Sequence, residues 1–292
     1  MKTDHSFTEN LAKFAVRAKY PYARLARDAD LKAIASLGAV AFGSSAFGID
    51  KFRGLRQVNS RILWIVNDSH GVIKGYVDIL PVKEQFADGL IAGSKKEADI
   101  TPSDLIGERQ IKEGQNGYIY VAAIVAREAQ TVNPGERGVD RTFSKLVLAT
   151  IHRLQDVLPI NPSLSKILAL SYQKTSEDKG AATDYLLEFG FTQVGKSSDG
   201  YPAYLLNMGR GHHGFEKVFS ASSIVRERWQ HKNRRRRKIF LLVFLFMVLV
   251  GLVLAALGRI LGIEKLYEAA VIHFGVVLLI TIASKYLERF LE

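Results

Sequence analysis

The spacing of apolar residues predicts a domain of strands and helices in the N-terminal part of the chain. Short runs rich in β-branched residues are typical of strands, and apolar residues three or four apart are typical of helices. The predicted strands cover residues 22–26, 61–66, 72–80, 118–126, 166–171, 191–194 and 201–206. The predicted helices cover residues 31–40, 51–58, 141–157 and 180–189. Residues 81–116 form an insert, in which Thr101 followed by Pro102 predicts the start of another helix.

Two of these elements indicate how the domain is layered. Residues 118–126 are strongly apolar with little alternation, which predicts a central strand buried on both faces. Helix 141–157 has an apolar face that consists of Phe143, Leu146, Val147, Thr150, Ile151 and Leu154. The pattern therefore predicts an α/β fold, with a mixed central sheet flanked by helices.

The C-terminal part of the chain carries two long apolar runs. Residues 239–258 contain no charged residue, and as a helix they would rise about 30 Å, which matches a bilayer core. The run 269–284 is shorter and spans only if Leu266 and Tyr267 extend it. We therefore expect an α-helical transmembrane hairpin, with helices at about 239–260 and 266–285.

The positions of the basic residues predict the orientation of this hairpin. The contiguous basic residues 234–238 and the pair Lys285 and Arg289 flank the hairpin on the same side, and the link between the helices has balanced charge. An excess of Lys and Arg marks the cytoplasmic face, so we expect both chain ends in the cytoplasm. The basic block adjoins a span and has no interleaved aromatic residues, so its expected partner is the lipid bilayer and no nucleic acid.

The net charge of +11 belongs mainly to this anchor. Residues 211–292 hold 13 basic and 6 acidic residues, which leaves a net charge of only +4 for the first 210 residues. The basicity of the chain is therefore weak evidence for an anionic substrate.

Several kinds of site are excluded or disfavoured by composition. The chain has no cysteine, which excludes disulfides, thiolate metal sites and a cysteine nucleophile. His212 and His213 are adjacent but have no third ligand near them in the sequence, so we expect a polar linker there and no metal site. Residues 1–27 have no apolar core segment and predict no signal peptide.

The patterns divide the chain into four parts. We expect an N-terminal extension at 1–20, a domain at 21–208, an amphipathic and basic linker at 209–238, and the membrane hairpin at 239–285. Apolar residues recur at roughly helical spacing in the linker, namely Phe215, Val218, Phe219, Val225 and Trp229. This linker helix lies on the bilayer, pairs with a partner, or packs on the domain itself.

The order of the elements resembles that of the GNAT acyltransferase superfamily. The segment Leu186-Leu187-Glu188-Phe189-Gly190-Phe191 is similar to that family's closing signature, and residues 75–81 and 118–157 agree with it. The insert after Leu80 resembles one found in a subset of bacterial members. The resemblance implies a GNAT-like domain that transfers an acetyl group from acetyl-coenzyme A to an amine. With the anchor, it predicts a bacterial inner-membrane protein with two spans that acts on the cytoplasmic side.

The resemblance also implies where the cofactor would bind. The backbone of Ile124, Val125 and Ala126 would hold the pantetheine arm, and Arg137, Gly138 and Thr142 would lie at the pyrophosphate. Asp140 and Thr142 stand where the family usually has small glycines. A carboxylate repels a pyrophosphate and a Cβ restricts the backbone, so the loop departs from the family pattern.

The catalytic positions depart from the family as well. Glu128, just after the central strand, and Asp78, at the end of a predicted hairpin, are candidate bases. The family's frequent Tyr acid corresponds to Leu186, one residue past Tyr185, and one residue rotates a helical side chain by ~100°. Glu128 and Tyr185 are therefore the predicted proton-transfer residues, and for the carboxylates a solvated surface position is the alternative.

Two functions follow from these departures, and the sequence leaves both open. The first is an active, membrane-anchored acyltransferase. The second is a catalytically degenerate sensor or binding module coupled to a membrane effector, as in stress or defence. Pairs of small residues such as Gly251 and Ala255 let helices approach closely, either within the hairpin or in a homodimer, which the GNAT-like domain could also form.

Overall fold

The computed structural model describes residues 7–127, 141–172, 182–210, 213–262, 264–266 and 268–277. The chain divides into two compact units, Met1–Arg226 and Glu227–Glu292. Glu128, Arg137 and Gly138 lie outside the described residues.

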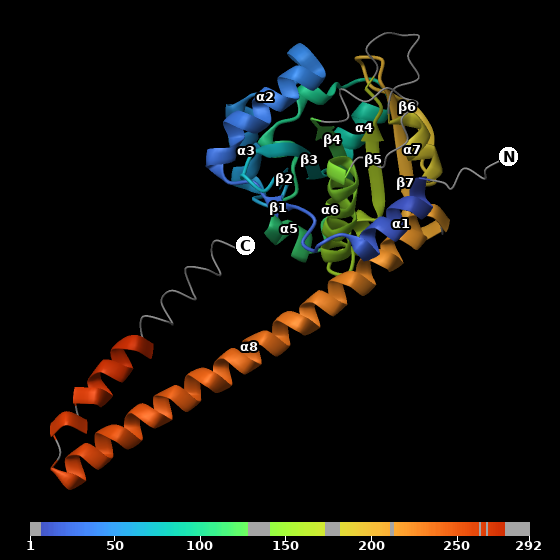
Figure 1. Ribbon diagram of the computed structural model, residues 1–292. Helices are drawn as coiled ribbons and strands as arrows, with labels where there is room; N and C mark the ends of the chain where they lie inside the picture. Colours follow the sequence, from blue (N-terminus) through green and yellow to red (C-terminus); the bar gives the residue numbers. More distant parts are fainter. Residues whose placement is uncertain are drawn as a thin grey trace. The chain divides into compact units, whose positions relative to one another are not determined.

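The first unit contains a seven-stranded mixed sheet within the described residues, with the order β1-β2-β3-β4-β5-β7-β6. Its strands are β1 (Arg24–Leu25), β2 (Leu63–Asn67), β3 (Ile73–Val82), β4 (Tyr118–Ala126), β5 (Lys166–Leu170), β6 (Thr192–Lys196) and β7 (Pro202–Asn207). Only β4 and β5 pair in parallel, and all other neighbours are antiparallel. The predicted fold class, a mixed sheet flanked by helices, is confirmed (Figure 1).

Helices cover both faces of this sheet (Figure 1). The helices are α1 (Phe7–Arg17), α2 (Leu31–Phe42), α3 (Ile49–Val58), α4 (Glu84–Ile91), α5 (Glu108–Lys112), α6 (Arg141–Val157), α7 (Thr183–Glu188) and α8 (His213–Leu261). One hydrophobic core lies between the sheet and α1, α6 and the start of α8, and a second lies between the sheet and α2, α3 and α4. The sheet therefore separates two apolar layers, as the apolar β4 predicts.

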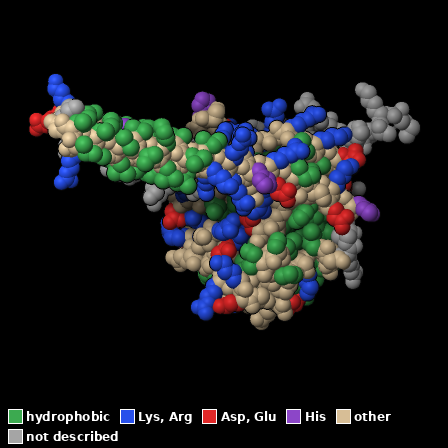
Figure 2. Space-filling view, turned by 90° about the horizontal axis from the view of Figure 1, so that it is seen from below, with side chains coloured by type: hydrophobic (Ala, Val, Ile, Leu, Met, Phe, Trp, Pro, Cys, Tyr) green, Lys and Arg blue, Asp and Glu red, His purple; other side chains and the backbone are tan. Residues whose placement is uncertain are grey.

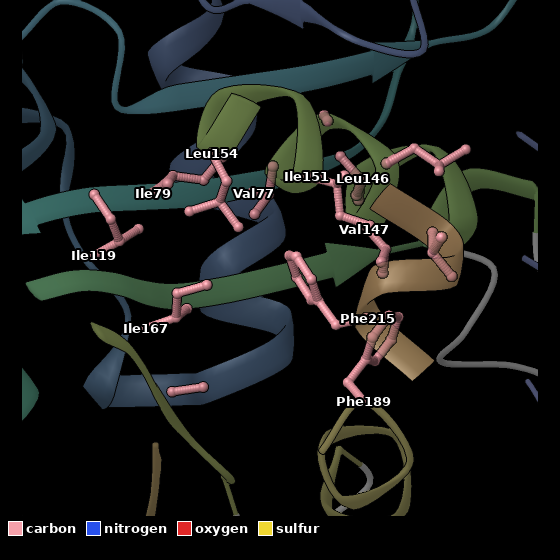
Figure 3. Packing of buried hydrophobic residues seen from close by; sticks show 14 of the residues in the cluster. Val77, Ile79, Ile119, Leu146, Val147, Ile151, Leu154, Ile167, Phe189 and Phe215 are labelled. Carbon is pink, nitrogen blue, oxygen red and sulfur yellow. The ribbon is translucent and has the colours of Figure 1, made fainter. Parts of the chain in front are cut away.

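Helix α6 forms the larger part of the first core. Its predicted apolar face packs on the sheet, and Figure 3 shows Leu146, Val147, Ile151 and Leu154 above Val77, Ile79, Ile119 and Ile167. Residues four apart on a helix lie on one face, and alternate residues of a strand lie on one face of a sheet. These two periodicities place the N-terminus of α6 next to the end of β4.

The parallel ladder between β4 and β5 is short. It runs from Ile119↔Ile167 to Val121↔Ala169, whereas β4 continues to Ala126. A β-bulge lies at the same level, because Asp78 opposes Ala123 while the next residue of β3 opposes Val121. From Ala122 to Ala126, the edge of β4 that faces β5 is therefore not paired with β5.

The N-terminal segment differs from the expectation of a separate extension. Residues 7–17 form α1, whose Leu11 and Ala15 are fully buried in the first core. The Thr8 amide also donates a hydrogen bond of 2.8 Å to the Glu188 carboxylate of α7. The buried face of α1 consists largely of small residues, which give a weak apolar signal in the sequence.

The start of α8 packs on the domain, which settles the alternatives for the linker. Phe215 and Val218 are buried in the first core. Arg226 forms an ion pair with Asp156 of α6, and the side-chain amide of Gln155 donates a hydrogen bond of 3.0 Å to the carbonyl of Phe219. The first turns of α8 are thus part of the domain.

The helix predicted to begin at Thr101 is shorter than expected. Thr101 and Asp104 form a capping box, but the helical segment is a single 3₁₀ turn, Pro102–Asp104. The α-helices of the insert are α4 and α5, on either side of this turn. Leu105 then makes an isolated bridge to Val82 of β3, which draws the chain back to the sheet. Another 3₁₀ turn, Glu97–Asp99, precedes it.

The second unit contains a helix that is long and apolar enough to cross a membrane. This is α8, and hydrophobic side chains cover it between two groups of charged residues (Figure 2). Residues 268–277 pack on it, where the His273 ring nitrogen Nε2 lies 2.8 Å from the carbonyl oxygen of Met247. A Cβ at Gly251 would lie 3.1 Å from His273, so this small residue permits the close approach. Two full spans are not shown, because residues 278–292 lie outside the described part.

We predict that Leu11→Ala destabilises the domain, because α1 belongs to its core. Removing this buried side chain leaves a cavity, and the free energy of unfolding should fall by about 2–5 kcal/mol. Val16→Ala is the matched control, since Val16 is on the same helix but 57% exposed. Chemical denaturation measures both variants, and equal, small effects would show that α1 is not part of the core.

Candidate functional site

A cavity passes through the sheet where β4 and β5 diverge. Its volume is about 270 Å³. The residues that line it come from both cores, and at the crossing they are small, namely Ala122, Ala123 and Ala169. On the α2 face the lining includes carboxylates and phenols, whereas on the α6 face it is almost entirely apolar. Openings at topological irregularities of a sheet are frequent ligand sites.

Asp78 is the most deeply buried carboxyl group of this site. Only 2% of the residue is exposed, and its Oδ1 atom has no hydrogen-bond partner within the described residues. Burial, together with the carboxylate of Glu97, raises the pKa of Asp78 well above its usual value. The prediction of a carboxylate at a hairpin end is therefore wrong for Asp78. The ten-residue β3 continues past it to Val82, so Asp78 lies within the strand beside the bulge.

Glu97 faces the same cavity from the insert. Burial raises the pKa of Glu97 to about 8, although the hydroxyl of Tyr120 and the ammonium group of Lys51 favour its ionised form. The Lys51 side chain also donates a hydrogen bond to the carbonyl of Ala98, which ties the turn that carries Glu97 to α3. Glu97 is thus close to its titration point near neutral pH, and burial favours the protonated form of Asp78.

Phenols surround the two carboxyl groups. Tyr120 is fully buried, and burial together with the nearby Glu97 carboxylate raises the pKa of its hydroxyl well above the usual value. Tyr76 comes from β3, and a Cβ at Gly38 of α2 would lie 2.7 Å from its hydroxyl oxygen. The absence of a side chain at Gly38 therefore lets Tyr76 reach its position beside the cavity.

The residues predicted to hold the cofactor arm lie at the edge of the cavity. Ile124 is partly buried and lines it, whereas Val125 and Ala126 are buried in β4. All three follow the last pair of the β4–β5 ladder, so their peptide groups on that edge are not used by β5. Thr142 is buried in the first turn of α6, where a Cβ at Gly75 would lie 3.0 Å from its methyl carbon.

Tyr185 lies on the α6 face of the cavity. Its ring contacts the rings of Phe7 and Phe143, with centroid distances of 4.5 Å and 5.4 Å, and 38% of the residue is exposed. Glu128 lies outside the described residues, so the pairing of Glu128 with Tyr185 stays a prediction. The carboxyl groups of the cavity are on the opposite face of the sheet.

Sequence reasoning missed Glu97 and Lys51. Glu97 belongs to an insert in which no cluster of reactive residues is apparent, and Lys51 is an ordinary charged residue of a helix. Neither has a local sequence signal, since their proximity to Asp78 arises only from the tertiary fold. Groups of three or more metal-ligating residues are not found in the described ranges.

We predict that Glu97 makes the stability of the protein depend on pH. The usual pKa is 4.5, so the unfolded chain releases this proton at lower pH than the folded protein, whose value is about 8. The contribution of Glu97 to the free energy of unfolding is therefore most favourable below pH 4.5 and falls as the pH rises to about 8. Glu97→Gln should lack this fall, so its stability relative to the parent protein should increase over this range.

The control for this experiment is Glu113→Gln, which makes the same chemical change at an exposed position of the insert. Chemical denaturation at several pH values compares the three proteins. If the Glu97→Gln and parent proteins lose stability in parallel, the raised pKa of Glu97 is refuted.

Comparison with known proteins identifies structures of similar fold. No protein-family model matches the sequence, and no curated protein matches it. The GNAT-like decarboxylase GphF in complex with isobutyryl-CoA is 15% identical, with a TM-score of 0.43, over 64% of this chain and 98% of that chain. The loading GNATL domain of CurA from Lyngbya majuscula is 9% identical, with a TM-score of 0.45, over 65% and 98% of the two chains.

An acetyltransferase of the GNAT family from Listeria monocytogenes 4b F2365 is 16% identical, with a TM-score of 0.35, over 63% of this chain and 92% of that chain. All of these identities are low and all of the TM-scores are below 0.5. The function proposed below therefore rests on the residues of the cavity.

Proposed function

We propose that the chain is an acyltransferase that moves an acyl group from acyl-coenzyme A to an amine. The observation that carries this proposal is the cavity at the divergence of β4 and β5. On one side it has an edge of β4 without a strand partner among the described residues, and on the other it has the carboxyl groups of Asp78 and Glu97. A free strand edge can hydrogen-bond an amide-containing arm, and carboxyl groups of raised pKa can transfer protons near neutral pH.

The residues present fit coenzyme A. The edge of β4 from Ala122 to Ala126 offers peptide groups for the two amides of the pantetheine arm. The arm would then lead to the first turn of α6, and the N-terminus of a helix favours an anion such as a pyrophosphate. Arg137, Gly138 and Thr142 are proposed as the pyrophosphate contacts on the strength of the sequence resemblance. Coenzyme A supplies the acyl group as a thioester.

The two carboxyl groups suit the two proton transfers of this reaction. Attack by an amine nitrogen on the thioester carbon forms a C–N bond and breaks the C–S bond. Glu97, with a pKa of about 8, would accept the proton that the amine loses. Asp78, which lies beside the bulge and whose protonated form is favoured by burial, would donate a proton to the leaving sulfur. Glu128 and Tyr185 stay predictions for these roles.

We also propose that residues 239–260 anchor the enzyme in a membrane, with the domain on the cytoplasmic side. The proposal is supported by the apolar surface of α8 and by the basic residues 234–238 that precede it. The described residues 268–277 suit the start of a second span, up to about residue 285, and the bacterial inner membrane is the proposed location.

One observation favours the alternative function of a ligand sensor. Phe215 lines the cavity and belongs to α8, the helix whose range continues to Leu261 in the apolar segment. A ligand that displaces Phe215 would therefore act directly on this helix. The sensor requires ligand binding without turnover, whereas the acyltransferase requires both.

We predict that the full chain, reconstituted in lipid nanodiscs, binds coenzyme A with micromolar affinity in calorimetric titration. Gly138→Glu should weaken binding at least tenfold, because it adds a negative charge at the proposed pyrophosphate site. Ser60→Glu adds the same charge at an exposed turn of the domain and should leave the affinity unchanged. A parent protein that does not bind at millimolar coenzyme A would exclude the acyltransferase.

We predict that Glu97→Gln and Asp78→Asn each lower kcat by about 10²-fold or more, because each removes a proton-transfer group. The affinity for coenzyme A should stay within about twofold of the parent value, since neither residue belongs to the proposed cofactor contacts. Release of free thiol from acyl-coenzyme A in the presence of a panel of primary amines measures the rate, with Glu113→Gln as the control. Unchanged rates in both variants would refute these roles, and binding without turnover in the parent would favour the sensor.

A further inference from the structure

The cavity extends to the α6 face of the sheet, where its lining is apolar. This apolar branch is lined by Val147, Ile151, Leu154, Ile167, Phe189, Phe191 and Phe215. In Figure 3, the side chains of α6 lie on one side of this layer, Ile167 of β5 lies on the other, and Phe215 and Phe189 close one end. The branch therefore belongs to the first core of the domain.

The apolar branch offers no group that would hold water or a polar ligand. The one hydroxyl among its α6 residues is that of Thr150, which already donates a hydrogen bond of 3.1 Å to the carbonyl of Leu146. Among the described lining residues of the α6 face, Tyr185 is ionisable, and it is 38% exposed. Asp78 and Glu97 come from the other face of the sheet. An apolar cavity of this kind stays dry and binds apolar ligands.

The apolar branch also lies beside the proposed cofactor arm. An arm that follows β4 from Ala126 towards Ala122 runs towards Val121 and Ile167, where the strands are still paired. The branch follows α6 from Val147 to Leu154, a distance of about 10 Å along the helix. A Cβ at Gly75, the residue opposite Ala126, would lie 3.0 Å from Leu146, so this part of α6 runs along the same stretch of β4. A group attached to the end of the arm would therefore lie against the lining of the branch.

We propose that the apolar branch binds the aliphatic chain of the acyl group, so that the enzyme prefers a medium-chain acyl-coenzyme A to acetyl-coenzyme A. This inference rests on the proposed function. The whole cavity, at about 270 Å³, has the volume of roughly nine water molecules in the liquid, so a chain of about eight carbons would fill much of it. Each methylene group moved from water into such a site multiplies the affinity by roughly four in the ideal case.

The test compares three probes on the full chain in lipid nanodiscs: coenzyme A and its stable S-ethyl and S-octyl thioethers. We expect S-octyl-coenzyme A to bind at least tenfold more tightly than S-ethyl-coenzyme A in calorimetric titration. If the two thioethers bind equally and coenzyme A also binds, the chain-length preference is wrong while the proposed function stands. If none of the three binds, the proposed function fails, and this inference with it.

Variants that fill the apolar branch make the test specific. Ile151→Phe and Ile167→Phe enlarge side chains that line it, and each should reduce the preference for S-octyl-coenzyme A to less than threefold. Binding of coenzyme A itself should not change, which also shows that the variants are folded. The control is Val40→Phe, at a position of α2 that is 70% exposed and should keep the full preference. A preference that survives in both cavity variants would overturn the proposal.

Discussion

The short parallel ladder between β4 and β5 is the constraint on which the site depends. A sheet normally pairs each strand along most of its length, but here the pairing stops at Val121 and β4 continues for five residues to Ala126. Antiparallel pairing with β3 on the other side keeps these residues extended. The result is an extended strand with one edge that has no strand partner in the described part of the chain, and buried peptide groups on such an edge are costly unless a ligand or another group uses them.

The bulge and the small residues at the crossing follow from the same constraint. Ala122 is the extra residue of β4, and the bulge turns Ala122 and Ala123 to the same face of the sheet. Larger side chains here or at Ala169 would close the connection between the two faces. The position of Asp78 opposite Ala123 then places a buried carboxyl group at the crossing, where it has few polar neighbours to replace water.

Much of the fold was predictable from the sequence, because regular periodicity specifies regular elements. Strand 118–126 and helix 141–157 agree with the structure at both ends, since each has a continuous apolar pattern and the strand is followed by turn residues. Helix α1 was missed because its buried side includes the small residues Ala12 and Ala15. The length of the helix at Pro102 was overestimated, because a cap specifies where a helix begins and not how far it continues.

The site was predictable only in part, for a different reason. Ile124 and Thr142 belong to elements whose place in the sheet follows from their order in the chain. Glu97 reaches Asp78 only because the insert folds back over the second core. Such a contact depends on tertiary packing, and a lone carboxylate in a polar insert carries no sign of it in the sequence.

The sheet separates an ionisable face of the cavity from an apolar one. This division explains how one cavity can serve both proton transfer and the binding of an apolar group. On the α2 face, burial favours the protonated form of Asp78 and raises the pKa of Glu97 to about 8, so the carboxyl groups can exchange protons without introducing two fixed charges. On the α6 face, aromatic and aliphatic side chains exclude water. A dry apolar face strengthens electrostatic interactions at the crossing, because nearby water would screen them. The raised pKa of Glu97 has its cause on its own side of the sheet, where the side chain is desolvated and the Asp199 carboxylate also disfavours its charge.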